Sequence, residues 1–252
     1  MHLGNILLRS PPSFGDLSDQ ELYDKYGSPK TESITRVHGE EIPRGVPSYA
    51  VLPIWLGEPS EEVTLQDAKI WVADMGEAFA PSLETRDYSH APVSSRPPEF
   101  LFDSGNKVSF SSDIWTLACS IWAMFGQGTP FRSFFPDGDF IMKEQIDILG
   151  RGGLPDSWWN KWEARSQYHT EAREPLADRY VSSWESQFEE DTQQARKDKG
   201  LSQVSPEEKE DLFAMLRPML IFRPEDRCTV AQVLESKWMK QWALPEYRKI
   251  KA

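Results

Sequence analysis

Two oxygen-bearing side chains stand beside short apolar runs and could hold a metal ion together. Asn5 precedes the run Ile-Leu-Leu, and Asp74 follows the run Lys69–Val72 and begins the tripeptide Asp-Met-Gly. Oxygen ligands suit Mg²⁺, and an Asn and an Asp at the mouths of neighbouring strands can hold that ion against nucleotide phosphates. Either residue alone is more often a simple turn residue. The pair therefore predicts a phosphoryl-transfer site only if the rest of the chain supports it.

Two short strands and a group of helices must position these residues. Residues 5–8 and 69–72 are apolar and β-prone, which predicts two short, buried strands that pair with each other. Residues 11–67, which lie between them, are rich in proline, glycine, serine and acid and show little sustained periodicity. We interpret this segment as a partly ordered insertion on the surface.

The second half of the chain is expected to be mainly helical. A helix that Ser111 or Ser112 can cap is apolar nearly all round as far as Phe125, so it should lie in the centre of the domain. Further helices are expected after Ser205 and Thr229, where capping-box residues precede apolar runs. The predicted fold class is therefore mainly α.

Composition limits the classes of function. The 252 residues carry a net charge of -12, which disfavours binding to nucleic-acid phosphates and permits a basic partner, although solubility is the simpler explanation. Cys119 and Cys228 lie in apolar helical patterns and indicate reduced core thiols of an intracellular protein. No run approaches the roughly 20 apolar residues that span a bilayer. We expect a monomer in the cytoplasm or nucleus, with no nucleic-acid or membrane partner.

Further motifs follow Asn5 and Asp74 in an order that resembles one family. A Pro-Pro-Glu that ends at Glu99 comes next, then an Asp-Ile-Trp that begins at Asp113, and then Arg227 in a late Arg-Pro-Glu-Asp-Arg. Over essentially the whole chain this series resembles the C-lobe of eukaryotic protein kinases. The resemblance implies a kinase-like C-terminal lobe with a short β-hairpin that carries the Mg²⁺-binding loop, a long surface insertion and an activation segment over residues 74–99.

The resemblance also implies roles for single residues. Asn5 and Asp74 would bind Mg²⁺ and, with Leu7 as the floor of the adenine pocket, ATP. Glu99 and Arg227 would form a buried ion pair that braces the substrate-binding segment. Asp113, at the start of the central helix, would hold the backbone of the catalytic loop.

Features of a subfamily are present as well. Arg96 stands before the Pro-Pro-Glu, as in the group that includes the SR-protein kinases, and a long insertion between the two metal ligands is typical of those kinases. The tryptophan-rich residues 154–159 resemble fungal members. Asp139 and Asp147 resemble the acidic helix where these kinases dock arginine-rich substrates, although a solvated acidic helix explains them equally well.

The chain departs from the family pattern at several positions. The resemblance places the catalytic aspartate two residues before His2, ahead of Met1, and leaves the N-lobe with its glycine-rich loop outside this chain. His2 stands where a lysine is usual, and Ala118 and Met75 replace a glycine and a phenylalanine. We therefore expect a serine/threonine kinase C-lobe that needs the N-lobe for tight binding of ATP and Mg²⁺ and is inactive alone.

Two other kinds of protein were weighed against a kinase. A catalytically dead kinase-like lobe could bind basic, Arg/Ser-rich proteins without chemistry, and the sequence leaves this alternative open. A metabolic enzyme has little support, because the chain shows neither a Rossmann fingerprint nor a P-loop. A zinc site is not expected, since the four histidines lack ligand spacing.

Overall fold

The computed structural model describes residues 1–10, 12–57, 59, 62–102, 107–132 and 137–251, and its regular structure is mainly helical, as predicted. The strands are β1 (Ile6–Leu8), β2 (Thr31–Ser33), β3 (Tyr49–Val51) and β4 (Ile70–Val72). The helices are α1 (Asp19–Tyr26), α2 (Glu99–Phe102), α3 (Phe110–Phe125), α4 (Gly138–Leu149), α5 (Asp156–Lys161), α6 (Trp184–Phe188), α7 (Ala195–Asp198), α8 (Pro206–Leu216), α9 (Val230–Leu234) and α10 (Leu244–Lys251). Among these described helices, none is both long and apolar enough to cross a membrane.

The chain divides into two compact units. One combines Met1–Leu7 with Ile70–Ala252, and we call it the helical unit. The other consists of Leu8–Lys69, and we call it the hairpin unit. The residues that the sequence singles out for chemistry all belong to the helical unit.

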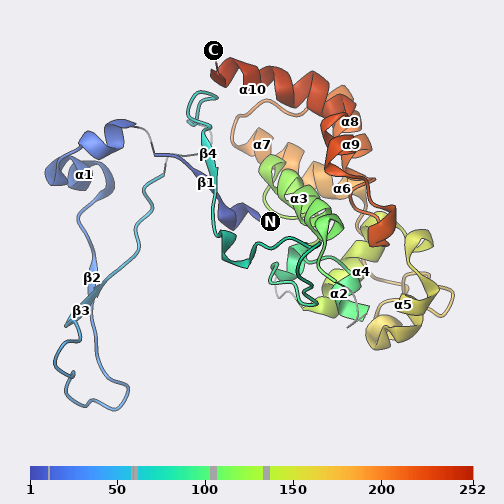
Figure 1. Ribbon diagram of the computed structural model, residues 1–252, viewed down its shortest axis with the longest axis horizontal. Helices are drawn as coiled ribbons and strands as arrows, with labels where there is room; N and C mark the ends of the chain where they lie inside the picture. Colours follow the sequence, from blue (N-terminus) through green and yellow to red (C-terminus); the bar gives the residue numbers. More distant parts are fainter. Residues whose placement is uncertain (11, 58, 60–61, 103–106, 133–136, 252) are drawn as a thin grey trace. The chain divides into compact units, whose positions relative to one another are not determined.

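The hairpin unit contains one capped helix and one strand pair. Ser18 and Glu21 form a reciprocal capping box at the start of α1. β2 and β3 pair antiparallel, with Thr31 opposite Val51 (Figure 1). The sequence did not predict this hairpin, because its three-residue strands are too short for a periodic signal. The segment is therefore more regular than its composition indicates.

The two strands predicted beside the metal ligands are present, but they are not buried. β1 and β4 pair in a two-stranded sheet, as expected. Leu7 is 48 % exposed, Ile70 52 % and Trp71 63 %, which corrects the prediction of buried strands. Apolar composition indicates that a strand forms, whereas burial needs a second layer packed on the sheet.

Helix α3 is the central helix of the helical unit, as its sequence predicts (Figure 1). It begins at Phe110, slightly before the predicted start, and the hydroxyl of Ser112 accepts a hydrogen bond from the backbone N–H of Ser109 at 3.3 Å. Trp122 is 1 % exposed, and its ring contacts those of Trp184 and Phe213 from α6 and α8. Aromatic packing between these helices forms the main core.

A second apolar cluster lies between α4 and α5. Trp158, Trp159 and Trp162 are buried there with Phe222 and Met142. This accounts for the tryptophan-rich segment, whose indoles bury large apolar areas. The region is therefore core structure, and it packs against α4, which carries both predicted docking residues, Asp139 and Asp147.

Candidate functional site

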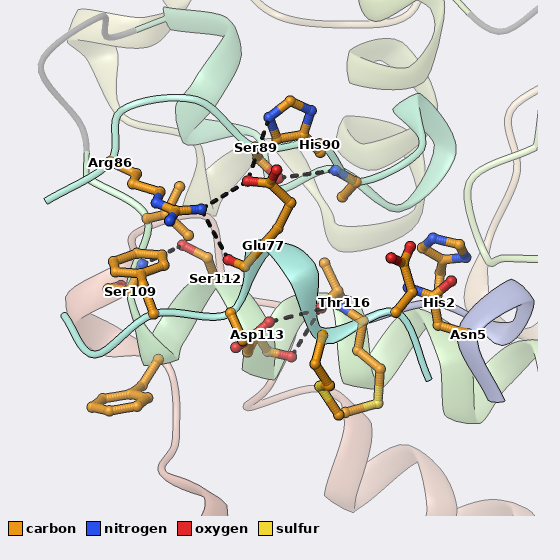
Figure 2. Close-up of a pocket in the computed structure, with 18 of the residues that line it drawn as sticks. His2, Asn5, Glu77, Arg86, Ser89, His90, Ser109, Ser112, Asp113 and Thr116 are labelled. Atoms are coloured by element: carbon orange, nitrogen blue, oxygen red, sulfur yellow. Dashed lines mark hydrogen bonds and ion pairs between the residues drawn. The ribbon is translucent and has the colours of Figure 1, made fainter. Parts of the chain in front are cut away.

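A pocket of about 320 Å³ lies in the helical unit, where the first residues of the chain, the end of β4 and the start of α3 come together. Its lining includes both predicted metal ligands, Asn5 and Asp74, and also Asp113. Figure 2 shows His2 and Asn5 at one side of the pocket and Arg86 at the other. The volume is at the lower end of the range for small-molecule sites.

Backbone conformation and strand pairing bring Asn5 and Asp74 to this pocket. The N–H of Ala73 donates to the carbonyl of Asn5 at 2.8 Å, which continues the pairing of β1 with β4. Asp74 then adopts the left-handed conformation, with φ 59° and ψ 54°, and the 3₁₀ turn Met75–Glu77 follows. Aspartate tolerates this region better than most residues, and such a conformation is often found at functional sites. The chain therefore leaves the strand sharply at Asp74.

The oxygen atoms of Asn5 and Asp74 fit a hard divalent ion of the Mg²⁺ type. Mg²⁺ is usually held by one or two carboxylates with waters and phosphates, so a site of two protein ligands is sufficient. Among the described residues, no group of three or more His, Cys, Asp or Glu could form a cage for a metal. The donor set therefore fits an ion shared with a phosphate ligand.

Asp113 and Thr116 hold the first residue of the chain against α3. The amine of Met1 lies 3.6 Å from the carboxylate of Asp113 and donates to the hydroxyl of Thr116 at 3.0 Å. The Thr116 hydroxyl also donates to the carbonyl of Asp113 at 3.1 Å. The sequence predicted a positioning role for Asp113 and missed Thr116, whose signal was its place three residues further along the same helix.

Leu7, the residue expected to form the floor of an adenine pocket, lies in β1 and does not line the described pocket. Its side chain is 48 % exposed. The structure thus places the two predicted metal ligands at one pocket and leaves the predicted adenine contact outside its lining.

Glu99 and Arg227 form a buried ion pair, which confirms the predicted contact across 128 positions. Arg227 donates to the two carboxylate oxygens of Glu99 at 2.9 and 2.6 Å, and their side chains are 1 % exposed or less. Arg227 also donates to the carbonyls of Ile221, Phe222 and Ser111. A bidentate pair with additional acceptors offsets the cost of burying two charges.

Arg96 anchors the segment that precedes Glu99. Its guanidinium donates to the carbonyl of Ala91 at 3.2 and 3.0 Å and lies over the ring of Tyr88. The side chain of Gln145, from α4, donates to the carbonyl of Arg96 at 3.3 Å. Arg96 therefore fixes this stretch of backbone, as its predicted structural role implies.

The expectation that Asp147 docks an arginine-rich substrate is wrong for this structure. The side chain of Asp147 is 1 % exposed, and Arg179 donates to both of its oxygens at 2.6 and 2.7 Å. The Nζ atom of Lys143 lies 3.1 Å from the same carboxylate. Burial raises the pKa of Asp147, but hydrogen bonds from Arg179 and His169 and the charge of Lys143 outweigh it and lower the pKa to about 2. This acid is already paired inside the chain.

Asp139, the other predicted docking residue, is partly exposed. Its carboxylate accepts a hydrogen bond from the indole N–H of Trp162 at 2.7 Å. It therefore links the start of α4 to the tryptophan cluster and keeps some accessible surface.

Sequence reasoning missed a group of charged residues at the rim of the pocket. Arg86 donates to the carboxylate of Glu77 at 2.7 Å, and His90 lies 3.9 Å from the same carboxylate (Figure 2). All three residues line the pocket. Glu77 ends a 3₁₀ turn and the other two lie in the loop that follows, without periodicity, so their types alone gave no signal that they would meet.

Neither a protein-family model nor a curated protein matches the chain. The site is therefore defined by its own residues: Asn5 and Asp74 at the end of a strand pair, Asp113 at the start of α3, and the charged rim formed by Glu77, Arg86 and His90.

Proposed function

We propose that the chain is the C-lobe of a serine/threonine protein kinase, which phosphorylates protein substrates of the Arg/Ser-rich class with ATP. One observation carries the proposal: Asn5 and Asp74, which are far apart in the sequence, line one pocket beside the start of α3. Phosphoryl transfer depends mainly on positioning and electrostatic stabilisation. A pocket with oxygen ligands at the end of a strand pair suits that task.

In this proposal Asn5 and Asp74 hold the Mg²⁺ of the nucleotide. The bound ion would neutralise charge on the phosphates. The protein residues do the positioning: the strand pair fixes the backbone of Asn5, and the left-handed conformation of Asp74 turns the chain at the pocket. Asp113 and Thr116 hold the first residue of the chain at the pocket, next to the position that the resemblance gives to the catalytic loop.

The Glu99–Arg227 pair supports the same proposal from outside the pocket. It joins Glu99, at the end of the segment 74–99, to Arg227 in the C-terminal part of the helical unit. Binding a protein substrate requires this segment to keep one conformation. A doubly hydrogen-bonded, fully buried pair provides that rigidity.

Binding of Mn²⁺ together with ATP tests the metal site directly. Mn²⁺ replaces Mg²⁺, and water-proton relaxation enhancement measures the Mn²⁺–ATP complex bound to the 252-residue chain. We expect a saturable enhancement that Asp74→Ala abolishes and Asn5→Ala weakens, with the larger effect for Asp74 because it carries charge. Glu210→Ala is the matched control, since it removes an exposed carboxylate on α8 away from the pocket.

Equal enhancement in the Asp74→Ala and unchanged chains would contradict the proposed site. The absence of any saturable enhancement in the unchanged chain would contradict it as well. Weak affinity is expected, because Asn5 and Asp74 supply only two ligands and the others must come from water and the phosphates.

A further inference from the structure

The guanidinium of Arg86 is bound on several sides by its own loop. It donates to the carboxylate of Glu77 at 2.7 Å, to the carbonyl of the same residue at 3.1 Å and to the carboxylate of Glu84 at 2.7 Å. Its carbon atom lies 4.8 Å from the centroid of the Phe79 ring. Two carboxylates and an aromatic face are the groups that recognise an arginine side chain in a protein ligand.

This arrangement is open to solvent. The side chains of Glu77 and Glu84 are 66 % and 52 % exposed, whereas that of Arg86 is 30 % exposed. Exposed ion pairs contribute little to stability. Replacing Arg86 with a second guanidinium from outside would therefore cost the fold little.

One acceptor of Arg86, Glu77, lines the same pocket as the proposed metal ligands. Glu77 is three positions after Asp74, and both line the same pocket, together with Phe79 and Arg86. Figure 2 shows the carboxylate of Glu77 between Arg86 and His90 within that pocket. The net charge of -12 also favours a basic ligand over an acidic one. A peptide that enters the pocket would thus bring its side chains to Glu77 and Phe79, while Glu84, which is not among the lining residues, contacts Arg86 through the Nε atom.

We propose that Glu77, Glu84 and Phe79 form a binding site for an arginine of a basic peptide, and that Arg86 occupies this site in the free protein. An incoming arginine displaces Arg86 and takes over its contacts. The identification of the peptide as a phosphoryl acceptor rests on the proposed function, whereas the binding itself needs neither nucleotide nor metal.

The loop remains tied to the helical unit when the Arg86 side chain is displaced. The carbonyl of Arg86 accepts a hydrogen bond from the N–H of Val108 at 2.7 Å, and this bond does not involve the side chain. A variant that lacks the guanidinium therefore keeps this backbone attachment. The variant Arg86→Ala should fold and present the two carboxylates without an internal competitor.

Peptide binding to the 252-residue chain tests this inference. Fluorescence anisotropy would follow a labelled Arg/Ser-repeat peptide without nucleotide, beside the same peptide with citrulline in place of arginine. Because Arg86 competes with the peptide, we expect Arg86→Ala to tighten binding about three- to fivefold. Glu77→Gln should weaken it, and the neutral citrulline peptide should bind poorly to every variant.

Arg36→Ala is the matched control. Arg36 pairs with Glu40 on the surface of the hairpin unit, so its removal changes the net charge by the same amount and also frees an exposed glutamate. It should leave binding unchanged. Equal affinity of Arg86→Ala and the unchanged chain, or an equal gain in Arg36→Ala, would overturn the inference, as would equal binding of the citrulline peptide. These outcomes are independent of Mn²⁺–ATP relaxation, which alone reports on the proposed metal site.

Discussion

At the scale of single residues, the Glu99–Arg227 pair has the largest expected effect on stability. Its side chains are buried, so removing one partner leaves a charge without compensation. We expect Glu99→Ala and Arg227→Ala each to lower the free energy of unfolding by about 3–5 kcal/mol, measured by urea denaturation. The double variant Glu99→Leu with Arg227→Met should recover part of that loss. Single variants that change stability by less than about 1 kcal/mol would show that the pair is solvated.

Asp147 makes the folding stability of the protein sensitive to acid. Its pKa falls from 3.8 to about 2 on folding, so its stabilisation is complete above pH of about 4 and is lost as the pH falls towards 2. Asp147→Asn should be less stable at neutral pH, because it leaves Arg179 and Lys143 without their carboxylate. The stability difference between the two proteins, from urea denaturation at several pH values, should shrink across that window. A difference independent of pH would contradict this assignment.

At the scale of elements, α9 depends on its first residue. The hydroxyl of Thr229 accepts from the N–H of Gln232 at 3.3 Å, and the Gln232 side chain accepts from the N–H of Thr229 at 2.8 Å. Because a five-residue helix has few internal hydrogen bonds, losing this cap matters. Thr229→Ala should cost about 1 kcal/mol in thermal or urea unfolding, while Thr229→Ser should cost much less. Equal losses in both would point to packing of the methyl group instead.

At the scale of the whole molecule, the hairpin unit should be dispensable for the fold of the helical unit. The N–H of Arg9 donates to the carbonyl of Lys69 at 2.8 Å, so the two ends of the unit are adjacent. Replacing residues 10–68 with Asn-Gly should close β1 and β4 into a tight hairpin. Because closing a shorter loop costs less conformational entropy, we expect the unfolding free energy to be unchanged or higher, measured by circular dichroism during urea denaturation. Loss of helical signal in the shortened protein would show that the helical unit needs residues 10–68.

The second prediction at this scale concerns catalysis by the 252-residue chain alone. The 252 residues contain no Gly-x-Gly-x-x-Gly loop, which in protein kinases covers the phosphates of ATP. Phosphoryl transfer needs groups that hold the phosphates and stabilise their charge in the transition state. We therefore expect no transfer of labelled phosphate from ATP to an Arg/Ser-repeat peptide. Phosphorylation by the unchanged chain that Asp74→Ala abolishes would contradict this prediction.

Local patterns in the sequence determined most of the helical core and the starts of the helices that have capping residues. The apolar periodicity of α3 and the capping residues Ser205 and Thr229 act within one or two turns of helix, so they can be read without a tertiary structure. The order of motifs also predicted that Asn5 and Asp74 belong together, and the structure places both at one pocket.

Only the tertiary structure decided which charges are available to a ligand. Asp147 looks in the sequence like one acid of an exposed helix, but Arg179 folds back and neutralises it. Glu77 and Arg86 carry no periodic signal, yet their loop brings them into contact at the pocket. Charge is a property of the residue, whereas burial and pairing depend on segments distant in the chain. Hydrophobic period and capping are local, and for this reason the sequence predicted the elements better than the functional surface.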